Sequence, residues 1–175
     1  ISGIFYLWIY HGLRYGYEAE RPSTETFETV STEETNTQEF IAREYYLKGI
    51  EFVFINLAED GNGELDFRVL DSDGRIKANS EIAISSVTAG EWEFIPLMGR
   101  LKAGESYILE ISAKDCSIPP YVLAREKKTV GENTVLTASG AETSLELLNA
   151  YGFAVSASRL ERLLITVMLA VCLFG

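Results

Sequence analysis

Apolar and polar residues alternate through much of the chain, which is the pattern of β-strands that are buried on one face. Residues 64–70 place Leu65, Phe67 and Val69 on one side of such a strand and charged residues on the other. Residues 50–57 are instead apolar on both sides. This second pattern predicts a central strand that is covered on both faces.

Further strands are predicted at residues 91–97, 105–113 and 121–127, with Gly-, Pro- and Asp-rich turns at intervals of about 8–15 residues. The pattern offers a strand at residues 82–87 or a short helical turn at residues 78–84, and it leaves residues 144–151 open between strand and helix. About seven to nine short strands with this spacing indicate an all-β fold, an antiparallel β-sandwich of the jelly-roll type.

The two ends of the chain have a different pattern, because residues 1–10 and 163–175 carry no charge. Each stretch is shorter than the ~20 residues of a membrane-spanning helix, and each stops at an end of the chain. Tyrosines and a tryptophan crowd the first boundary, as in an interfacial aromatic belt. We therefore expect a piece of a larger polytopic membrane protein that contacts the lipid bilayer through both ends. A buried core helix is the alternative for residues 160–175.

These patterns divide the chain into four parts. Residues 1–17 are predicted to end one transmembrane helix, residues 18–37 to form a polar lead-in, residues 38–158 to form the β-sandwich, and residues 159–175 to begin the next helix. Both ends should lie on the same side of the domain. We expect the domain on the extracytoplasmic side of a cell membrane, because long translocated domains largely escape the positive-inside rule.

The chain is acidic, with 15 Lys and Arg against 26 Asp and Glu and a net charge of −11. This balance argues against nucleic acid as a partner, because phosphate binding requires basic residues. It also argues against a domain that lies along an anionic lipid surface. The acidity is typical of a solvated protein surface.

Residues for catalysis or metal binding are scarce. His11 is the only histidine and lies beside the apolar N-terminal stretch, so no Ser-His-Asp or Cys-His set is expected within the domain. Cys116 and Cys172 lie in different parts of the chain, and we expect no disulfide between them. We expect no catalytic residue, no metal ligand and no cofactor. A glycoside hydrolase with a carboxylate pair stays open as an alternative, because acidic residues are numerous.

Residues 60–66 (DGNGELD) resemble the middle of an EF-hand calcium loop. On that pattern the first ligand position falls on Ala58 and the twelfth, a bidentate Glu, falls on Val69. Two strong anionic ligands are therefore missing. We interpret the segment as a polar hairpin turn between the strands at residues 50–57 and 64–70.

Aromatic residues are the remaining candidates for ligand binding. Trp92 and Tyr107 alternate with polar neighbours and are expected in the core. Tyr45, Tyr46 and Tyr121 are the candidate ligand-binding residues, because one of two adjacent strand residues must point away from the core. Exposed aromatic rings of this kind would make the domain a carbohydrate-binding module, which is the alternative to a non-catalytic accessory domain.

Several segments also carry a family resemblance. They are Gln38 to Phe40, LKGIEF at residues 47–52, GELDFRVLDSDG at residues 63–74, and residues 92–112, which include the strand pattern Gly-x-x-Tyr-x-Leu-x-Ile. Residues 38–128 together resemble the extracytoplasmic jelly-roll domains, galactose-binding-like in their strands, that are inserted between helices of bacterial polytopic membrane proteins.

Some proteins with such domains are similar to membrane glycosyltransferases that use lipid-linked sugars. The resemblance implies a non-catalytic accessory domain with a link to cell-envelope glycans. Its partners would be the rest of the parent protein and a glycan. In such transferases the catalytic acid is expected on a membrane-side loop outside this segment.

Overall fold

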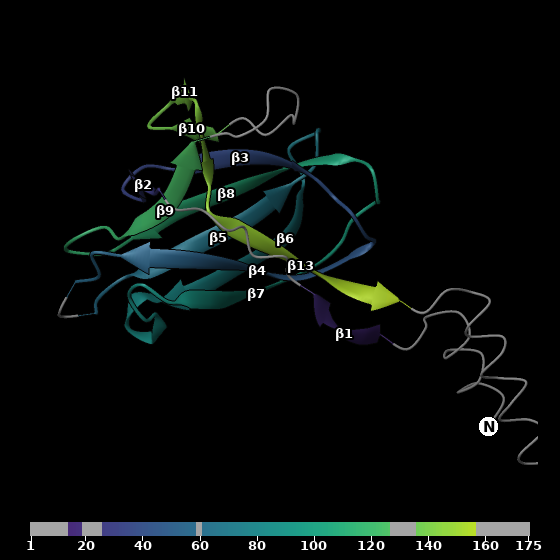
Figure 1. Cartoon of the computed structure of the whole chain (residues 1–175), viewed down its shortest axis with the longest axis horizontal. Coiled ribbons are helices and arrows are strands. Elements are labelled where there is room, and N and C mark those ends of the chain that lie inside the picture. The colour runs from purple at the N-terminus through teal and green to yellow at the C-terminus, as the bar shows by residue number, and fades with distance from the viewer. Residues whose placement is uncertain (1–13, 19–25, 59–60, 127–135, 157–175) are drawn as a thin grey trace, which may run out of the picture.

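The chain folds as a sandwich of two antiparallel β-sheets (Figure 1). The computed structural model describes residues 14–18, 26–58, 61–126 and 136–156. One sheet has seven strands: β1 (Arg14–Glu18), β2 (Glu28–Ser31), β4 (Tyr46–Ile55), β7 (Trp92–Arg100), β9 (Tyr121–Glu126), β12 (Leu145–Leu147) and β13 (Asn149–Ser156). The other has six: β3 (Asn36–Ile41), β5 (Glu64–Leu70), β6 (Ile76–Ala83), β8 (Ser106–Lys114), β10 (Leu136–Ala138) and β11 (Ala141–Thr143). The predicted β-sandwich is confirmed, and the arrangement is consistent with a jelly roll.

The hydrophobic core lies between the two sheets. Phe52 and Phe54 of the seven-stranded sheet meet Phe67 of the six-stranded sheet, and the Phe52 and Phe67 ring centroids are 5.8 Å apart. Leu65 and Val69 flank Phe67 and are fully buried, as the alternating pattern predicts. Burial of each such side chain contributes roughly 1.5–3 kcal/mol, so this layer holds the sheets together.

Strand β4 occupies the central position predicted for it. It pairs with β7 along one edge and with β13 and β9 along the other. Val53 on the outer face is buried as well as Phe52 on the inner face. Gly49 is required on the outer face, because a Cβ there would lie 2.2 Å from the Phe94 ring.

Two sequence predictions in the seven-stranded sheet and its connections are wrong. Residues 60–63 do not form a hairpin, because β4 and β5 belong to different sheets and the connection crosses between them. Trp92 does not fill the core; it is only half-buried, and Ile95 and Leu97 are the buried residues of β7. Alternation identifies the two faces of β7 but not which of them turns inward, since both carry apolar residues.

The ambiguous segments are also settled. Residues 76–83 are strand β6, followed by a 3₁₀ turn at Ile84–Ser86, and residues 144–151 contain strand β12 and the start of β13. Strand β2 lies within the predicted polar lead-in and pairs with β9. There are more strands than predicted, because short strands such as β10 and β11 carry too few residues to show a period.

The first and last described strands pair with each other. Strand β1 is antiparallel to β13, and Arg14 and Ser156 are Cα partners. The described chain therefore enters and leaves at one edge of the sandwich, as Figure 1 shows at its lower right. Of the predicted flanking helices, at residues 1–17 and 159–175, residues 14–17 lie in strand β1 instead of a helix, and the remainder falls outside the described residues. Within the described ranges, no helix has the length and apolar character of a membrane span.

Candidate functional site

The three candidate tyrosines do not form one site. Tyr45 precedes β4, is 55% exposed, and stands next to the half-buried Tyr46. Tyr121 begins β9 opposite Ile55, at the other end of β4. A strand of this length spans about 30 Å, so Tyr121 is far from the tyrosine pair. No shared aromatic platform for a sugar arises from these three residues.

The depression on the outer face of the six-stranded sheet has a volume of about 300 Å³. It is lined by Thr37, Glu39, Ser72, Ser106, Tyr107, Ile108 and Thr137. Glu39 is the only carboxylate in this lining and accepts a hydrogen bond from the Ser106 hydroxyl. The Tyr107 side chain is buried, and its hydroxyl oxygen accepts from the Lys102 backbone N–H at 2.8 Å.

This depression therefore lacks the groups that the two alternative functions need. A carboxylate-pair glycosidase requires two carboxyl groups about 5–9 Å apart across the substrate. Glu39 alone does not supply this pair in the depression. A stacking site for sugars requires an exposed aromatic face, and Tyr107 keeps its ring in the core.

A charged network crosses the same outer face farther along the strands. Asp66 is only 5% exposed and pairs with Arg68 and Lys114, each at 2.7 Å. Lys114 also approaches Glu81 at 3.4 Å. The hydrogen bond to Asp66, followed by that to Glu81, raises the pKa of the Lys114 ammonium above its ordinary value of 10.5. The network stabilises the pairing of β5, β6 and β8 from outside.

This network bears on the calcium-loop resemblance. Asp66 occupies the ninth position of the EF-hand pattern, but its carboxylate is engaged by two cationic side chains. Asp60 lies outside the described residues. In the part of the chain that the structure describes, no group of three acidic, histidine or cysteine residues comes together as a metal site. His11 also falls outside the described ranges, and Cys116 is a free thiol that packs against the core.

The end of the sandwich from which β1 and β13 leave is here called the proximal end. Its described segments are residues 41–48, 71–77 and 98–105. Two backbone hydrogen bonds there continue the pairing within each sheet. Ala42 N–H donates to the Glu105 carbonyl at 3.0 Å beyond the β3–β8 pair, and Leu101 N–H donates to the Tyr45 carbonyl at 2.9 Å beyond the β4–β7 pair.

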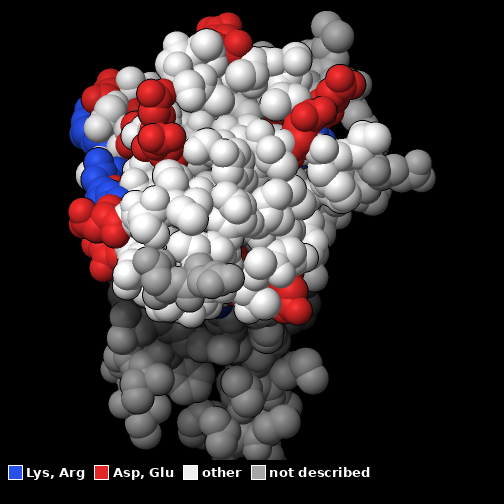
Figure 2. Space-filling view, turned by 90° about the vertical axis from the view of Figure 1, so that its left-hand side faces the viewer, with Lys and Arg blue, Asp and Glu red and all other residues white. Residues whose placement is uncertain are grey.

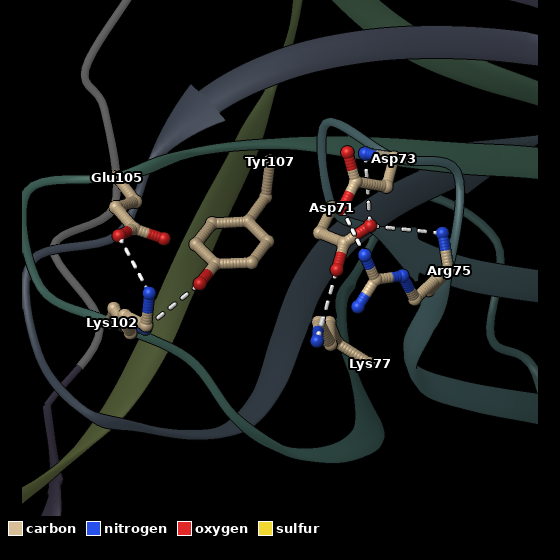
Figure 3. Close-up of polar contacts among 7 residues, drawn as sticks. All are labelled: Asp71, Asp73, Arg75, Lys77, Lys102, Glu105 and Tyr107. Carbon is tan, nitrogen blue, oxygen red and sulfur yellow. Dashed lines mark hydrogen bonds and ion pairs between the residues drawn. The ribbon is translucent and has the colours of Figure 1, made fainter.

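Two proximal turns are held by short polar contacts (Figure 3). The Asp71 carboxylate accepts from the Arg75 N–H at 2.9 Å and from the Asp73 N–H at 3.0 Å, and pairs with Lys77 at 2.9 Å. The Arg75 N–H, followed by the Lys77 ammonium, lowers the pKa of Asp71 below its ordinary value of 3.8. In the other turn, Lys102 pairs with Glu105 at 3.0 Å.

The opposite, distal end consists of residues 31–35, 56–58, 61–64, 84–93 and 114–121. These segments are also interlocked. Ile84 N–H donates to the Gly63 carbonyl at 3.0 Å, and Thr32 N–H donates to the Pro120 carbonyl at 3.0 Å. Figure 2 shows this face, on which acidic groups surround a broad uncharged centre and the basic groups gather at one edge.

Sequence reasoning missed both the Asp66 network and the contrast between the two ends. Alternation placed Asp66 and Arg68 outward, which is correct, but the partner Lys114 is distant in sequence. The charges of the turns could have indicated this contrast, because turns at one end of an antiparallel sandwich alternate along the sequence with turns at the other end.

Comparison of the chain with protein-family models and with curated proteins gives no match.

Proposed function

We propose that this chain is a non-catalytic extracytoplasmic domain of a larger polytopic membrane protein, held at the membrane by both of its ends. In this protein the domain would support the handling of cell-envelope glycans by the membrane-embedded part. The role in glycan handling is carried over from the family resemblance of residues 38–128.

The pairing of β1 with β13 is the observation that carries the proposal. A domain inserted between two neighbouring membrane helices needs its entry and exit close together. Arg14 and Ser156 meet this requirement as Cα partners. The uncharged stretches at residues 1–10 and 163–175 adjoin these strands in the sequence and supply the apolar character that a bilayer requires.

The non-catalytic part of the proposal is supported by the surface of the described residues. The depression on the six-stranded sheet contains one carboxylate, Glu39, without a second acid or base in its lining. Asp66, the most buried acid of the outer network, is neutralised by two cations and lies at the sheet surface. Neither arrangement offers the paired acid and base that hydrolysis or glycosyl transfer needs.

Surface labelling in cells that make the parent protein tests where the domain lies. Ala89 is exposed in a distal turn, and Ala89→Cys in a Cys116→Ser, Cys172→Ser background gives a single thiol. We expect a membrane-impermeant maleimide to label this thiol in intact cells as strongly as after lysis. The same chain without Ala89→Cys is the control for background labelling.

Labelling that occurs only after lysis would contradict the extracytoplasmic placement. Release of the protein from the membrane fraction by salt or carbonate, without detergent, would contradict attachment through the apolar ends.

A further inference from the structure

We propose that the proximal end of the sandwich docks on lipid headgroups and prefers a bilayer surface with anionic lipids. This inference rests on the proposed function, because it assumes that β1 and β13 lead to the membrane. It goes further by assigning a lipid-contacting surface to the folded domain itself.

Exposed apolar side chains gather at the proximal end. Eight large hydrophobic residues are exposed in the described chain, and four of them lie in the proximal segments. These four are Ile41 (54% exposed), Tyr45 (55%), Ile76 (56%) and Met98 (74%). Isolated exposed apolar residues are ordinary, but several at one end beside a membrane attachment suit the boundary between headgroups and acyl chains. Tyr45 is of a type enriched at that boundary.

Charge distinguishes the proximal end from the rest of this acidic chain. The proximal segments contain six basic and four acidic side chains, whereas the described distal segments contain one basic and six acidic. An anionic bilayer would therefore attract the proximal end and repel the distal end. This polarity gives the domain a preferred orientation despite the net charge of −11.

Two basic residues are best placed to contact lipid phosphates. Lys77 and Lys102 already pair with Asp71 and Glu105 within their own turns. By contrast, Lys48 and Arg100 form no ion pair with any described residue and lie near the start of β4 and at the end of β7. Since the guanidinium of arginine donates to two phosphate oxygens at once, the exposed Arg100 is the stronger of the two candidate contacts.

The connections to the apolar stretches have three residues before β1 and six residues, 157–162, after β13. Residues 11–13 separate the first uncharged stretch from Arg14, and three extended residues span about 10 Å at most. Ser156 lies three residues beyond Phe153, the partner of Leu47, so the β1–β13 pair extends about 10 Å past Leu47. This tether keeps the proximal end at a high effective concentration near the bilayer, so weak lipid contacts suffice for docking.

Fluorescence quenching on the complete chain tests the docking. The chain, with Cys116→Ser and Cys172→Ser, carries a fluorophore at Met98→Cys and is reconstituted into vesicles of zwitterionic lipid with and without about one third anionic lipid. A spin label on the lipid headgroup serves as the quencher. We expect quenching at position 98 but not at the distal control position, Ala89→Cys, and stronger quenching with anionic lipid.

Two charge variants, one at each end of the domain, test the role of the proximal charges in the same quenching experiment. Lys48→Gln with Arg100→Gln lowers the net charge by two at the proximal end, and Ala89→Glu with Ile118→Glu lowers it equally at the distal end. We expect the proximal variant to reduce the ratio of docked to undocked domain on the order of fivefold for each charge removed. The distal variant should leave quenching at position 98 unchanged.

The outcomes separate this inference from the proposed function. A chain that does not float with the vesicles in a density gradient contradicts the membrane attachment itself. A chain that floats but shows no quenching at position 98, or equal quenching at positions 98 and 89, overturns the docking inference and leaves the attachment standing. Equal effects of the two charge variants would overturn the assignment of Lys48 and Arg100.

Discussion

The proximal and distal ends of the sandwich close the same sheets, yet they differ in charge and in the packing of one connection. The distal connection at Gly63 presses against its neighbours, because a Cβ there would lie 2.6 Å from the Cys116 Cβ and 2.7 Å from the Lys114 carbonyl oxygen. The proximal turn at Gly104 is open, with no atom within 4 Å of the corresponding position. The distal turn at Gly90 is equally open, so the tight packing belongs to the 61–64 connection.

Crossing from one sheet to the other does not by itself require tight packing, because Gly104 and Gly90 also lie in connections between the sheets, from β7 to β8 and from β6 to β7. The 61–64 connection is tight because it lies against residues 114–116. Turns that only reverse the chain within one sheet, such as residues 71–75, are free to carry charged and apolar side chains outward. The proximal end uses this freedom for Ile76 and Arg75, which are both exposed.

The largest predicted difference is between two glycine substitutions, one at each end. Gly63→Ala should lower the free energy of unfolding by about 3 kcal/mol, because it adds a steric clash to a backbone with φ of +99°. Gly104→Ala has the same left-handed strain, with φ of +83°, but no clash, and should cost about 1 kcal/mol. Denaturant unfolding measures both. Equal losses would show that the two turns are packed alike.

A smaller effect is predicted for the carboxylate that holds the proximal turn. The folded-state pKa of Asp71 is lowered, so its contribution to stability is present above its ordinary value of 3.8 and is lost as pH falls through the folded pKa. Asp71→Asn should therefore unfold at lower denaturant than the parent chain at pH 7, and this difference should shrink below pH 3.8.

Asp115→Asn is the matched control at the distal end. Asp115 is exposed and has a φ of +52°, a conformation that asparagine tolerates. Its unfolding midpoint should stay close to that of the parent chain at both pH values. A gap between Asp71→Asn and the parent chain that is the same at neutral and acid pH would contradict the role of the Asp71 charge.

Much of the fold follows from local patterns. The alternation in residues 64–70 predicts β5, and the two-sided apolar run in residues 50–57 predicts the central β4. Both predictions succeed because the burial of a side chain is reflected in the type of that same residue. Which strands pair with each other does not follow from such local patterns. The connection at residues 60–63 has hairpin composition but joins two sheets, and nothing in its own residues encodes which strand comes alongside.

The functional surface was harder to predict than the fold. Residue type predicts Tyr45, Tyr46 and Tyr121 as candidates, yet the adjacent Tyr45 and Tyr46 lie at one end of β4 and Tyr121 lies at the other. The proximal surface brings together residues 41–48, 71–77 and 98–105, and only the sheet register shows that these segments share an end. Surface sites of this kind depend on the order and pairing of the strands, which are difficult to predict from a single sequence.

The pairing of β1 with β13 is central to the proposed attachment, because this pairing brings the two ends of the domain together. Tyr15 and Val155 are Cα partners in it, and antiparallel partners lie within the range that a disulfide can bridge. Tyr15→Cys with Val155→Cys, in a chain without Cys116 and Cys172, places a thiol on each strand.

Mild oxidation of this double variant is the most direct test. We expect rapid formation of an intramolecular disulfide, seen as a mobility shift that reductant reverses, while the control pair Tyr15→Cys with Ala89→Cys stays reduced. If Tyr15→Cys and Val155→Cys form no more disulfide than the control pair, the two ends of the domain do not meet, and the proposed attachment is wrong.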